Sequence, residues 1–487
     1  MVKFGFNRIR GLHVLVSRSL KNKKRRRKNS VKKRRNKEIL KKWIFPCLIL
    51  SSFFGIIPQE AKAEEVSLQN FSEQLDQTYQ FPFQTGIVIN QQTGQILYEK
   101  QADQLHGIAS LTKLLSLYVI YDYLANDKLQ LDSKVSISPE VAAHSRAEGL
   151  SNVPLQAGDD YTVDQLLDAI IIASANSATV ALAEKIAGSE DQFIQLMENK
   201  LKELHISDYQ LVSASGLHSG LRMDGGKEGV SPKAENQLSA RSIAVLVQRL
   251  LTDYPDVQRR AQITYKNFKV SDQIVYPLQN SNQLLPGMKY ETKQVTGLKT
   301  GTEEKAGACL VATFRMNQQS IIAVTLGAPS DKERFLGTKK LLKSLENHLV
   351  WTRFAKEGSF YNEGHPVSVY GGNKVITRLQ YQRDVTCFLP KKHSEDVNVW
   401  SDFENSVQYN TEGQLEIKAP LVMDKKVADE RLHLSFYENI NGQKFLKAPL
   451  SPTEEVKAVS LGVQITRKVH ETIQFIMSWF RYKIAYG

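Results

Sequence analysis

Cysteine is almost absent from this sequence, with three residues in 487. Cys47 lies in an apolar stretch near the N-terminus, and Cys309 and Cys387 are far apart in the chain. Two such cysteines do not make a disulfide framework, although an exported protein could pair them, and no Cys/His cluster has the spacing of a zinc site. Disulfide-stabilised scaffolds and zinc modules are therefore excluded, and we expect neither a metal nor another cofactor.

Excess positive charge is missing from most of the chain, although the formal total is +13. Residues 1–63 carry 19 Lys and Arg against 2 Asp and Glu, whereas residues 64–487 carry 45 against 49. Basicity is thus a property of the N-terminal tail alone. The rest of the chain lacks the basic surface of a nucleic-acid-binding protein, so we expect no nucleic acid partner for the mature chain.

No apolar run is long enough for a comfortable membrane span. The longest, residues 43–57, follows Lys41 and Lys42 and precedes Ala61-Lys62-Ala63, an A-x-A cleavage signature. This pattern is typical of a secretory signal peptide, so we expect an exported mature chain that begins near Glu64. The alternative is an uncleaved anchor with a cytoplasmic tail that binds nucleic acid, which the cleavage signature disfavours.

The periodicity of residues 64–353 predicts an α+β domain with helices packed against an antiparallel sheet. Residues 64–80 are expected to be a polar lead-in, and Thr162 with Gln165 predicts a capping box. Residues 213–238, rich in Gly, Ser and Pro, are expected to form a long loop of the kind that is often functional. The other expected elements are helices at residues 110–125, 162–173, 178–186, 190–204, 239–252 and 332–350 and strands at residues 85–90, 95–99, 294–300, 306–314 and 319–326.

The C-terminal third contains two different residue patterns. Short alternating runs broken by turn signals predict a small all-β domain in residues 354–455. In residues 456–487, apolar side chains recur on one helix face. Aromatic and cationic residues around that face favour an amphipathic helix lying in a membrane interface, and an ordinary docking helix is the alternative. The apolar positions are Ile465, Val469, Ile473, Ile476, Phe480 and Ile484.

One short segment, residues 107–115, places Ser110 and Lys113 on one face of an expected helix start. A serine hydroxyl becomes a good nucleophile only when a base takes its proton. A lysine can be that base if burial or a second cation keeps it neutral, and the flanking leucines offer burial. The spacing alone is weak, because Ser30 and Lys33 repeat it in the basic tail.

Two further motifs complete a constellation: Ser174-Ala175-Asn176 at a corner between helices and Lys299-Thr300-Gly301-Thr302 at a strand end. With Ser110-x-x-Lys113, in this order, the sequence resembles the penicillin-binding, serine DD-peptidase family, and looks most similar to the low-molecular-weight D-alanyl-D-alanine carboxypeptidases. The resemblance covers most of the mature chain. We therefore expect a tail and signal peptide at residues 1–63, a catalytic domain at 64–353, a β-rich domain at 354–455 and an amphipathic membrane-anchoring helix at 456–487.

The resemblance implies a role for each catalytic residue. Ser110 would attack the D-Ala–D-Ala peptide bond, and Lys113 would take the serine proton. Ser174 would relay a proton to the departing amine, and Asn176 would orient the substrate amide and Lys113. Lys299 would supply positive charge that keeps Lys113 neutral and attracts the substrate carboxylate.

The resemblance also implies a substrate-binding strand made of Lys299, Thr300, Gly301 and Thr302, with an oxyanion hole from the N–H groups of Ser110 and Thr302. Arg334 occupies a place similar to that of an arginine that holds the terminal carboxylate in the related enzymes, and a solvated helix charge is the alternative. The expected partners are peptidoglycan stem peptides that end in D-Ala-D-Ala, β-lactams, and the outer face of the cytoplasmic membrane.

Rival functions remain open at this point. A β-lactamase of class A would need a glutamate in an E-x-x-L-N loop, and none lies between Ser174 and Lys299. A transpeptidase would share every motif, and a non-catalytic membrane-anchored scaffold would need a vestigial site. His106 and His218 could suggest a Ser–His pair, but Lys113 already supplies a base, so we expect His106 in a loop and His218 at the rim of the site or in solvent.

Overall fold

The structure is a computed structural model that describes residues 67–226, 229–392, 399–403, 408–409, 415–423 and 425–486. The predicted basic tail and signal peptide lie outside the described residues, and so does Cys47.

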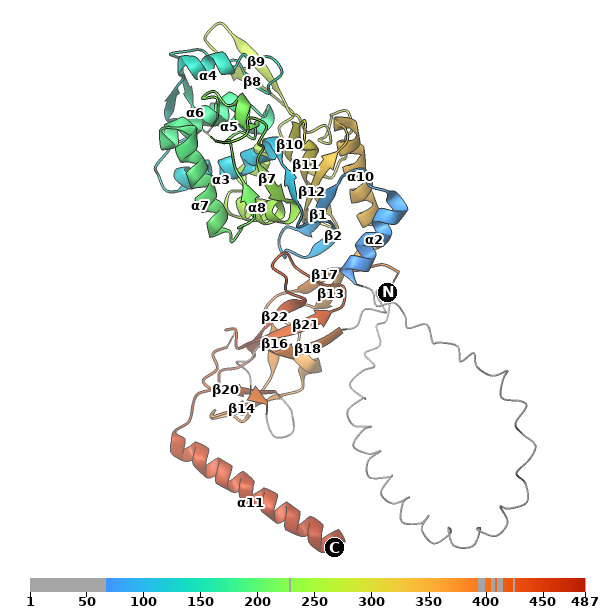
Figure 1. Ribbon diagram of the computed structural model, residues 1–487. Helices are drawn as coiled ribbons and strands as arrows, with labels where there is room; N and C mark the ends of the chain where they lie inside the picture. Colours follow the sequence, from blue (N-terminus) through green and yellow to red (C-terminus); the bar gives the residue numbers. More distant parts are fainter. Residues whose placement is uncertain are drawn as a thin grey trace, which may run out of the picture. The chain divides into compact units, whose positions relative to one another are not determined.

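A five-stranded antiparallel sheet is the centre of the N-terminal part (Figure 1). Its strand order is β10-β11-β12-β1-β2, so the β1–β2 hairpin and the later strands β10, β11 and β12 form one sheet. The join is the pairing of β1 with β12, in which Ile87 lies opposite Val324. The strands are β1 (Thr85–Asn90), β2 (Ile96–Lys100), β10 (Val295–Glu303), β11 (Gly307–Met316) and β12 (Gln319–Ala328).

Helices cover both faces of this sheet. Helix α10 (Asp331–His348) packs against β11 and β12, and α8 (Ala240–Asp253) packs against β12 and β1 from the other side (Figure 1). Nearly every residue of β11 and β12 is therefore buried, as expected for strands that are covered on both faces. The predicted α+β class is confirmed.

The chain between β2 and β10 forms a helical block beside the sheet (Figure 1). The predicted capping box is present, because Thr162 and Gln165 cap each other's backbone N–H groups. The helices are α3 (Thr112–Ala125), α4 (Pro139–His144), α5 (Val163–Ile172), α6 (Asn176–Ala187), α7 (Glu190–Glu203) and α9 (Asp256–Ala261), with 3-10 turns η2 (Ala109–Leu111) and η3 (Ser219–Leu221). The short strands are β3 (Leu105–Gly107), β4 (Lys134–Ser136), β5 (Asp160–Thr162), β6 (Tyr209–Gln210), β7 (Gln237–Ser239), β8 (Tyr265–Lys269) and β9 (Val275–Gln279).

The expected polar lead-in is wrong, because residues Leu68–Tyr79 form helix α2. Ser67 caps its N-terminus, and Leu68, Phe71 and Leu75 are buried at helical spacing. These few buried side chains are enough to pack a mostly polar helix against β2. Helix α9 and the β8–β9 hairpin were likewise not predicted.

Beyond α10 the described residues form strands and one 3-10 turn before the last helix. Val385, Phe388 and Phe436 belong to the same hydrophobic core as the five-stranded sheet. A second, separate core contains Val369 and Ile417. The elements are β13 (Leu349–Ala355), η4 (Tyr361–Gly364), β14 (Val367–Tyr370), β15 (Ile376–Thr377), β16 (Leu379–Tyr381), β17 (Val385–Pro390), β18 (Val399–Phe403), β19 (Gln408–Tyr409), β20 (Leu415–Lys418), β21 (Ala428–Leu434) and β22 (Phe445–Pro452).

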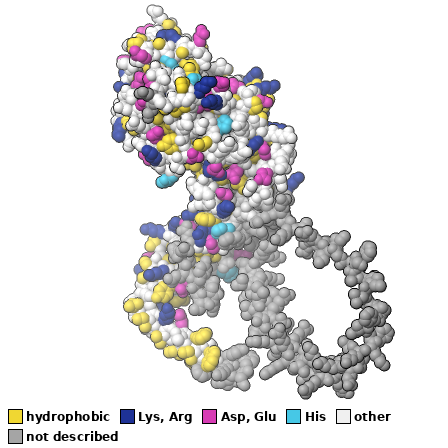
Figure 2. Space-filling view, viewed as in Figure 1, with side chains coloured by type: hydrophobic (Ala, Val, Ile, Leu, Met, Phe, Trp, Pro, Cys, Tyr) yellow, Lys and Arg dark blue, Asp and Glu magenta, His cyan; other side chains and the backbone are white. Residues whose placement is uncertain are grey.

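The last helix, α11 (Leu461–Tyr486), carries the predicted apolar face. Ile465, Val469, Ile473 and Ile476 lie on it and are 47–55% exposed. Figure 2 shows hydrophobic side chains gathered along this helix. In the part of the chain that the structure describes, no helix combines the length and the apolar character needed to cross a membrane.

Candidate active site

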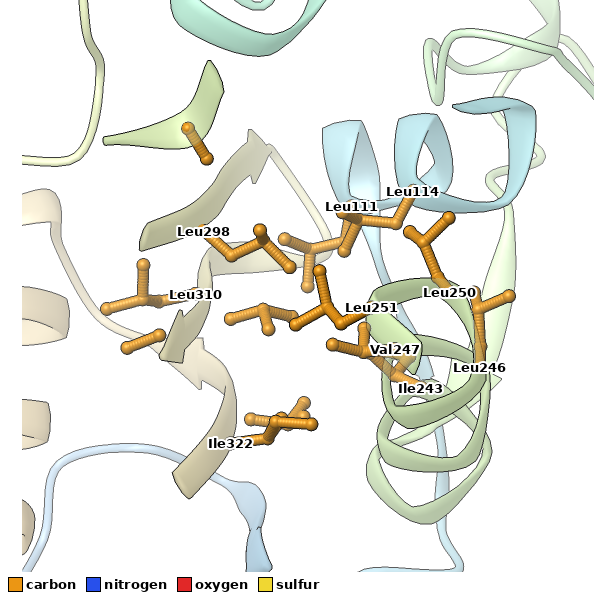
Figure 3. Close-up of a cluster of buried hydrophobic side chains, with 14 of the residues drawn as sticks. Leu111, Leu114, Ile243, Leu246, Val247, Leu250, Leu251, Leu298, Leu310 and Ile322 are labelled. Atoms are coloured by element: carbon orange, nitrogen blue, oxygen red, sulfur yellow. The ribbon is translucent and has the colours of Figure 1, made fainter. Parts of the chain in front are cut away.

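An apolar cluster holds the Ser110 turn against the sheet (Figure 3). Leu111 of η2 and Leu114 of α3 lie in one apolar cluster with Leu298 and Leu310 of the sheet and with Val247 of α8. All five side chains are buried. The turn that carries Ser110 is therefore held in place because the leucines beside it pack against both the sheet and α8.

Ser110 lies in the 3-10 turn η2, two residues before the first residue of α3, rather than inside the α-helix. Lys113 is fully buried, and its Nζ lies 2.8 Å from Ser110 Oγ. The same Nζ lies 2.7 Å from Asn176 Oδ1 and 2.6 Å from the Ser215 carbonyl oxygen. The structure thus brings together Ser110, Lys113 and Asn176, which the sequence separates by up to 66 residues.

These three contacts fit a neutral amine. The Asn176 and Ser215 oxygens can only accept hydrogen bonds, so they take the two N–H groups of an uncharged lysine. Its lone pair then faces the Ser110 hydroxyl, which can donate. Burial, and secondly the charge of Lys299, hold the pKa of Lys113 well below its usual range, while Glu303 and Glu190 oppose this shift.

Lys299 lies on β10, is 1% exposed, and donates to Ser174 Oγ at 2.7 Å. Ser174 sits between α5 and α6 with φ of +59°, a left-handed conformation that a serine rarely adopts outside functional sites. Burial, and then the charge of Arg334, lower the pKa of Lys299 to about 7. A bound carboxylate would raise that pKa again and keep Lys299 charged.

Strand β10 approaches η2 so closely at Gly301 that only glycine fits. A Cβ there would lie 2.9 Å from the Ile108 carbonyl oxygen and 3.0 Å from the Ser110 nitrogen. The neighbouring hydroxyls are also fixed, since Thr300 Oγ1 lies 2.7 Å from Ser281 Oγ and Thr302 Oγ1 donates to Asp331 at 3.1 Å.

Arg334 is not a solvated helix charge, because it is 4% exposed. Its guanidinium donates to the Gly301 carbonyl at 3.0 Å and to Thr302 Oγ1 at 2.9 Å, and it pairs with Asp331 at 3.0 Å. Arg334 therefore touches the substrate-binding strand predicted from the sequence.

The sequence predicts that residues 213–238 form a functional loop, but it does not predict which atoms of residues 212–216 contact the site. The Ser215 carbonyl contacts Lys113, and Asn236 Oδ1 accepts from the Val212 and Ser213 N–H groups at 2.6 and 3.1 Å. A backbone carbonyl leaves no mark in a sequence; the only available signal was the length and composition of the 213–238 segment.

Gly216 offers a test of this loop. Its φ is +87°, and a Cβ would lie 2.0 Å from the Ala109 carbonyl oxygen. We expect Gly216→Ala to lower the free energy of unfolding by about 3 kcal/mol or more. The alanine would be strained by the positive φ, and its methyl group would overlap the Ala109 carbonyl oxygen. Gly149→Ala is the matched control, with φ of +79° and no atom within 4 Å, and should cost only about 1 kcal/mol. Equal losses in urea unfolding would contradict the overlap.

Arg334 offers a test through pH. In the reaction predicted from the sequence, the rate of Ser110 acylation should fall as pH rises through the pKa of Lys299, about 7, because Lys299 then loses its charge. Arg334→Gln removes a positive charge, so the pKa of Lys299 rises and this alkaline limb should move up by roughly half to one pH unit. Arg249→Gln, at an exposed arginine, is the control. A limb that stays in place or moves down would refute the coupling.

Other candidate groups take no part in the cluster. His106 Nδ1 lies 2.8 Å from the Gly107 carbonyl oxygen and His218 Nδ1 lies 2.9 Å from that of Pro232, so neither contact involves Ser110. Cys309 and Cys387 are both buried free thiols. Within the described residues, no group of His, Cys, Asp and Glu could hold a metal ion.

The fold has clear relatives among solved structures. A crystal structure of a peptidoglycan synthesis regulatory factor (PBP3) from Streptococcus pneumoniae matches with a TM-score of 0.65 and 28% identity over 78% of this chain and all of that one. Penicillin binding protein 5 from Haemophilus influenzae shares the fold, with a TM-score of 0.60 and 24% identity over 77% of this chain and 98% of its own. The fold is therefore that of the penicillin-binding proteins.

Sequence comparison narrows this class. The sequence profile of the D-alanyl-D-alanine carboxypeptidases matches residues 72–330. D-alanyl-D-alanine carboxypeptidase DacF of Bacillus subtilis is 25% identical over 398 residues, 80% of this chain and 90% of the relative. DacC of Escherichia coli is 31% identical over 262 residues, 53% of this chain and 59% of the relative. The chain belongs to the D-alanyl-D-alanine carboxypeptidase family of serine peptidases.

Proposed function

We propose that this chain removes the terminal D-alanine from peptidoglycan stem peptides ending in D-Ala-D-Ala, through an acyl-enzyme on Ser110. The contact that carries the proposal is that between Lys113 Nζ and Ser110 Oγ, at 2.8 Å, in an arrangement that suits a neutral amine. The neutral amine takes the serine proton as Oγ bonds to the carbonyl carbon of the penultimate D-alanine.

The other residues divide the remaining work. Asn176 holds Lys113 and receives the substrate amide, and Ser174 passes a proton to the departing amine of the terminal D-alanine. Lys299, Thr300, Thr302 and Arg334 bind the substrate strand and its carboxylate. Water then hydrolyses the ester and frees Ser110. β-Lactams acylate the same serine.

Charge development explains the backbone geometry at Gly301. As the tetrahedral intermediate forms, its oxygen becomes negative, and the N–H groups of Ser110 and Thr302 are proposed to bind it. One such donor is typically worth about 3–4 kcal/mol of barrier. The glycine is what lets β10 come within reach of the Ser110 nitrogen.

The direct test is release of D-alanine from a pentapeptide ending in D-Ala-D-Ala by residues 64–487. We expect release together with a slowly reversed penicillin adduct on the peptide that contains Ser110, found by mass spectrometry. Fast penicillin turnover without D-alanine release would favour a β-lactamase. Transfer of the acyl group to an added amine in preference to water would favour a transpeptidase.

We also propose that the mature chain is exported and held at the outer face of the cytoplasmic membrane by α11. The support is the exposed apolar face of this helix and its Arg467, Lys468 and Arg481. Anionic vesicles should sediment the chain, and Ile473→Asp should weaken that binding without changing D-alanine release in solution. Unchanged vesicle binding by Ile473→Asp would contradict the assignment.

A further inference from the structure

Glu190 is the first residue of α7 and belongs to none of the three motifs, and its charge acts on Lys113. Its side chain is 6% exposed, and that of Arg222 is 2% exposed. Glu190 Oε1 accepts the Ala214 N–H at 2.8 Å, and Oε2 lies 3.4 Å from Arg222 Nε. Burial raises the pKa of Glu190 above its usual value, while the Arg222 charge and the Ala214 N–H favour the ionised carboxylate.

This buried pair holds the loop that contacts the lysine. Arg222 donates to the Val212 carbonyl at 2.9 Å, and Ser116 Oγ donates to the Ala214 carbonyl at 2.5 Å. Glu190 takes the N–H of the same Ala214. The next carbonyl along the chain, that of Ser215, is the one that accepts from Lys113. Fixing Ala214 at both its N–H and its carbonyl sets the direction in which the backbone enters Ser215. The Ser215 carbonyl shares a planar peptide group with the Gly216 N–H, which donates to Ser213 Oγ at 3.0 Å within the same loop.

We propose that Glu190 is a positioning residue for acylation: together with Arg222 it fixes residues 212–216 so that the Ser215 carbonyl takes one N–H of Lys113 and the lone pair stays on Ser110. The inference rests on the proposed function, because it assigns Lys113 as the base. A rotated Ser215 carbonyl would free that N–H, and the amine would lose the orientation that points its lone pair at the nucleophile.

Charge gives Glu190 a second effect. The charged groups that face Lys113 are Lys299 and Glu303 from β10 and Glu190 from α7. Arg222 pairs with Glu190, while the charges of His218 and Glu235 act on Glu303. The Glu190 charge opposes the effect of Lys299 on the pKa of Lys113. Removing it lowers this pKa further, so the acid limb of the acylation rate should move to lower pH.

Two substitutions in residues 64–487 separate position from charge. Glu190→Gln keeps an oxygen for the Ala214 N–H but loses the charge; Glu190→Ala loses both. We expect Glu190→Ala to slow acylation by penicillin about tenfold or more, with the affinity of the first, non-covalent complex unchanged. Glu190→Gln should recover most of the rate and show the acid limb at lower pH.

Asp168 provides the matched control. It is a buried carboxylate that pairs with Arg260 at 2.8 Å and also with Lys266, but makes no hydrogen bond to the 212–216 loop. Asp168→Ala should lower the melting temperature of the transition that unfolds the catalytic sheet and its helices while keeping the acylation rate and its pH profile, which separates lost stability from lost positioning.

The outcomes are distinct. Parent rate and parent pH profile in a folded Glu190→Ala would overturn the inference, as would a Glu190→Gln that neither restores the rate nor moves the acid limb. If Glu190→Ala does not fold, Glu190→Gln decides through its pH profile alone. Absence of any Ser110 adduct in the parent chain would instead sink the proposed function.

Discussion

Lys113→Arg should abolish acylation of Ser110 while the protein keeps its fold. Arginine cannot give up its proton in a protein, so it cannot act as the base. Loss of a general base typically costs about 10²–10⁴ in rate. The measurement is the rate of labelling by a fluorescent penicillin, followed beside the near-UV circular dichroism spectrum.

The site makes this substitution a sharp one. The Asn176 and Ser215 oxygens accept hydrogen bonds from arginine as readily as from lysine, so binding partners remain. What is lost is the lone pair that faces Ser110. Lys100→Arg, in a partly exposed pair with Asp76 at 3.0 Å, is the control and should label like the parent. Normal labelling of Lys113→Arg would show that another group deprotonates Ser110.

Gly301→Ala should reduce acylation by about 10²–10³, the range seen when one oxyanion donor is removed. The added methyl group would meet the Ile108 carbonyl oxygen at 2.9 Å and the Ser110 and Leu111 nitrogens at 3.0 and 3.1 Å. These are backbone atoms, so strand β10 or turn η2 has to move. Either movement separates the two N–H groups that we propose bind the oxyanion.

The effect should fall on the covalent step. We expect the acylation rate constant divided by the dissociation constant of the non-covalent complex to drop, mainly because the rate constant falls. Stopped-flow mixing with a chromogenic β-lactam measures both constants. Gly462→Ala, with no atom within 4 Å of the new methyl group, should behave as the parent. A Gly301→Ala variant with an unchanged rate constant would mean that β10 is not part of the oxyanion site.

The features that could be predicted from the sequence are those set by side chains in short local patterns. Thr162 and Gln165 cap α5 because a capping box needs only two residues three apart. Ser110, Lys113, Ser174, Asn176 and Lys299 could be named because each lies in a short motif. The structure joins Lys113 by hydrogen bonds to Ser110 and Asn176, and Lys299 to Ser174, and the charge of Lys299 acts on Lys113.

What the sequence did not reveal lies in backbone atoms and in weakly patterned segments. Helix α2 is mostly polar, and only its spacing of Leu68, Phe71 and Leu75 distinguishes it from a loop. The β8–β9 hairpin buries only Phe268 and Leu278 among its ten strand residues, too few for a visible alternation. The Ser215 carbonyl has no side-chain signature, since any residue would supply the same oxygen.

The two hydrophobic cores determine how this chain comes apart. Gln95 of the chain before β2 hydrogen bonds to both the N–H and the carbonyl of Phe388, each at 2.8 Å, so β17 is fastened to the catalytic sheet. Val369, Ile417 and Val456 belong to the second core. Heating should therefore give two calorimetric transitions rather than one, and a single melting temperature would describe neither. In a limited digest, the strands around the second core should be cleaved first, leaving a protease-resistant fragment that retains β17.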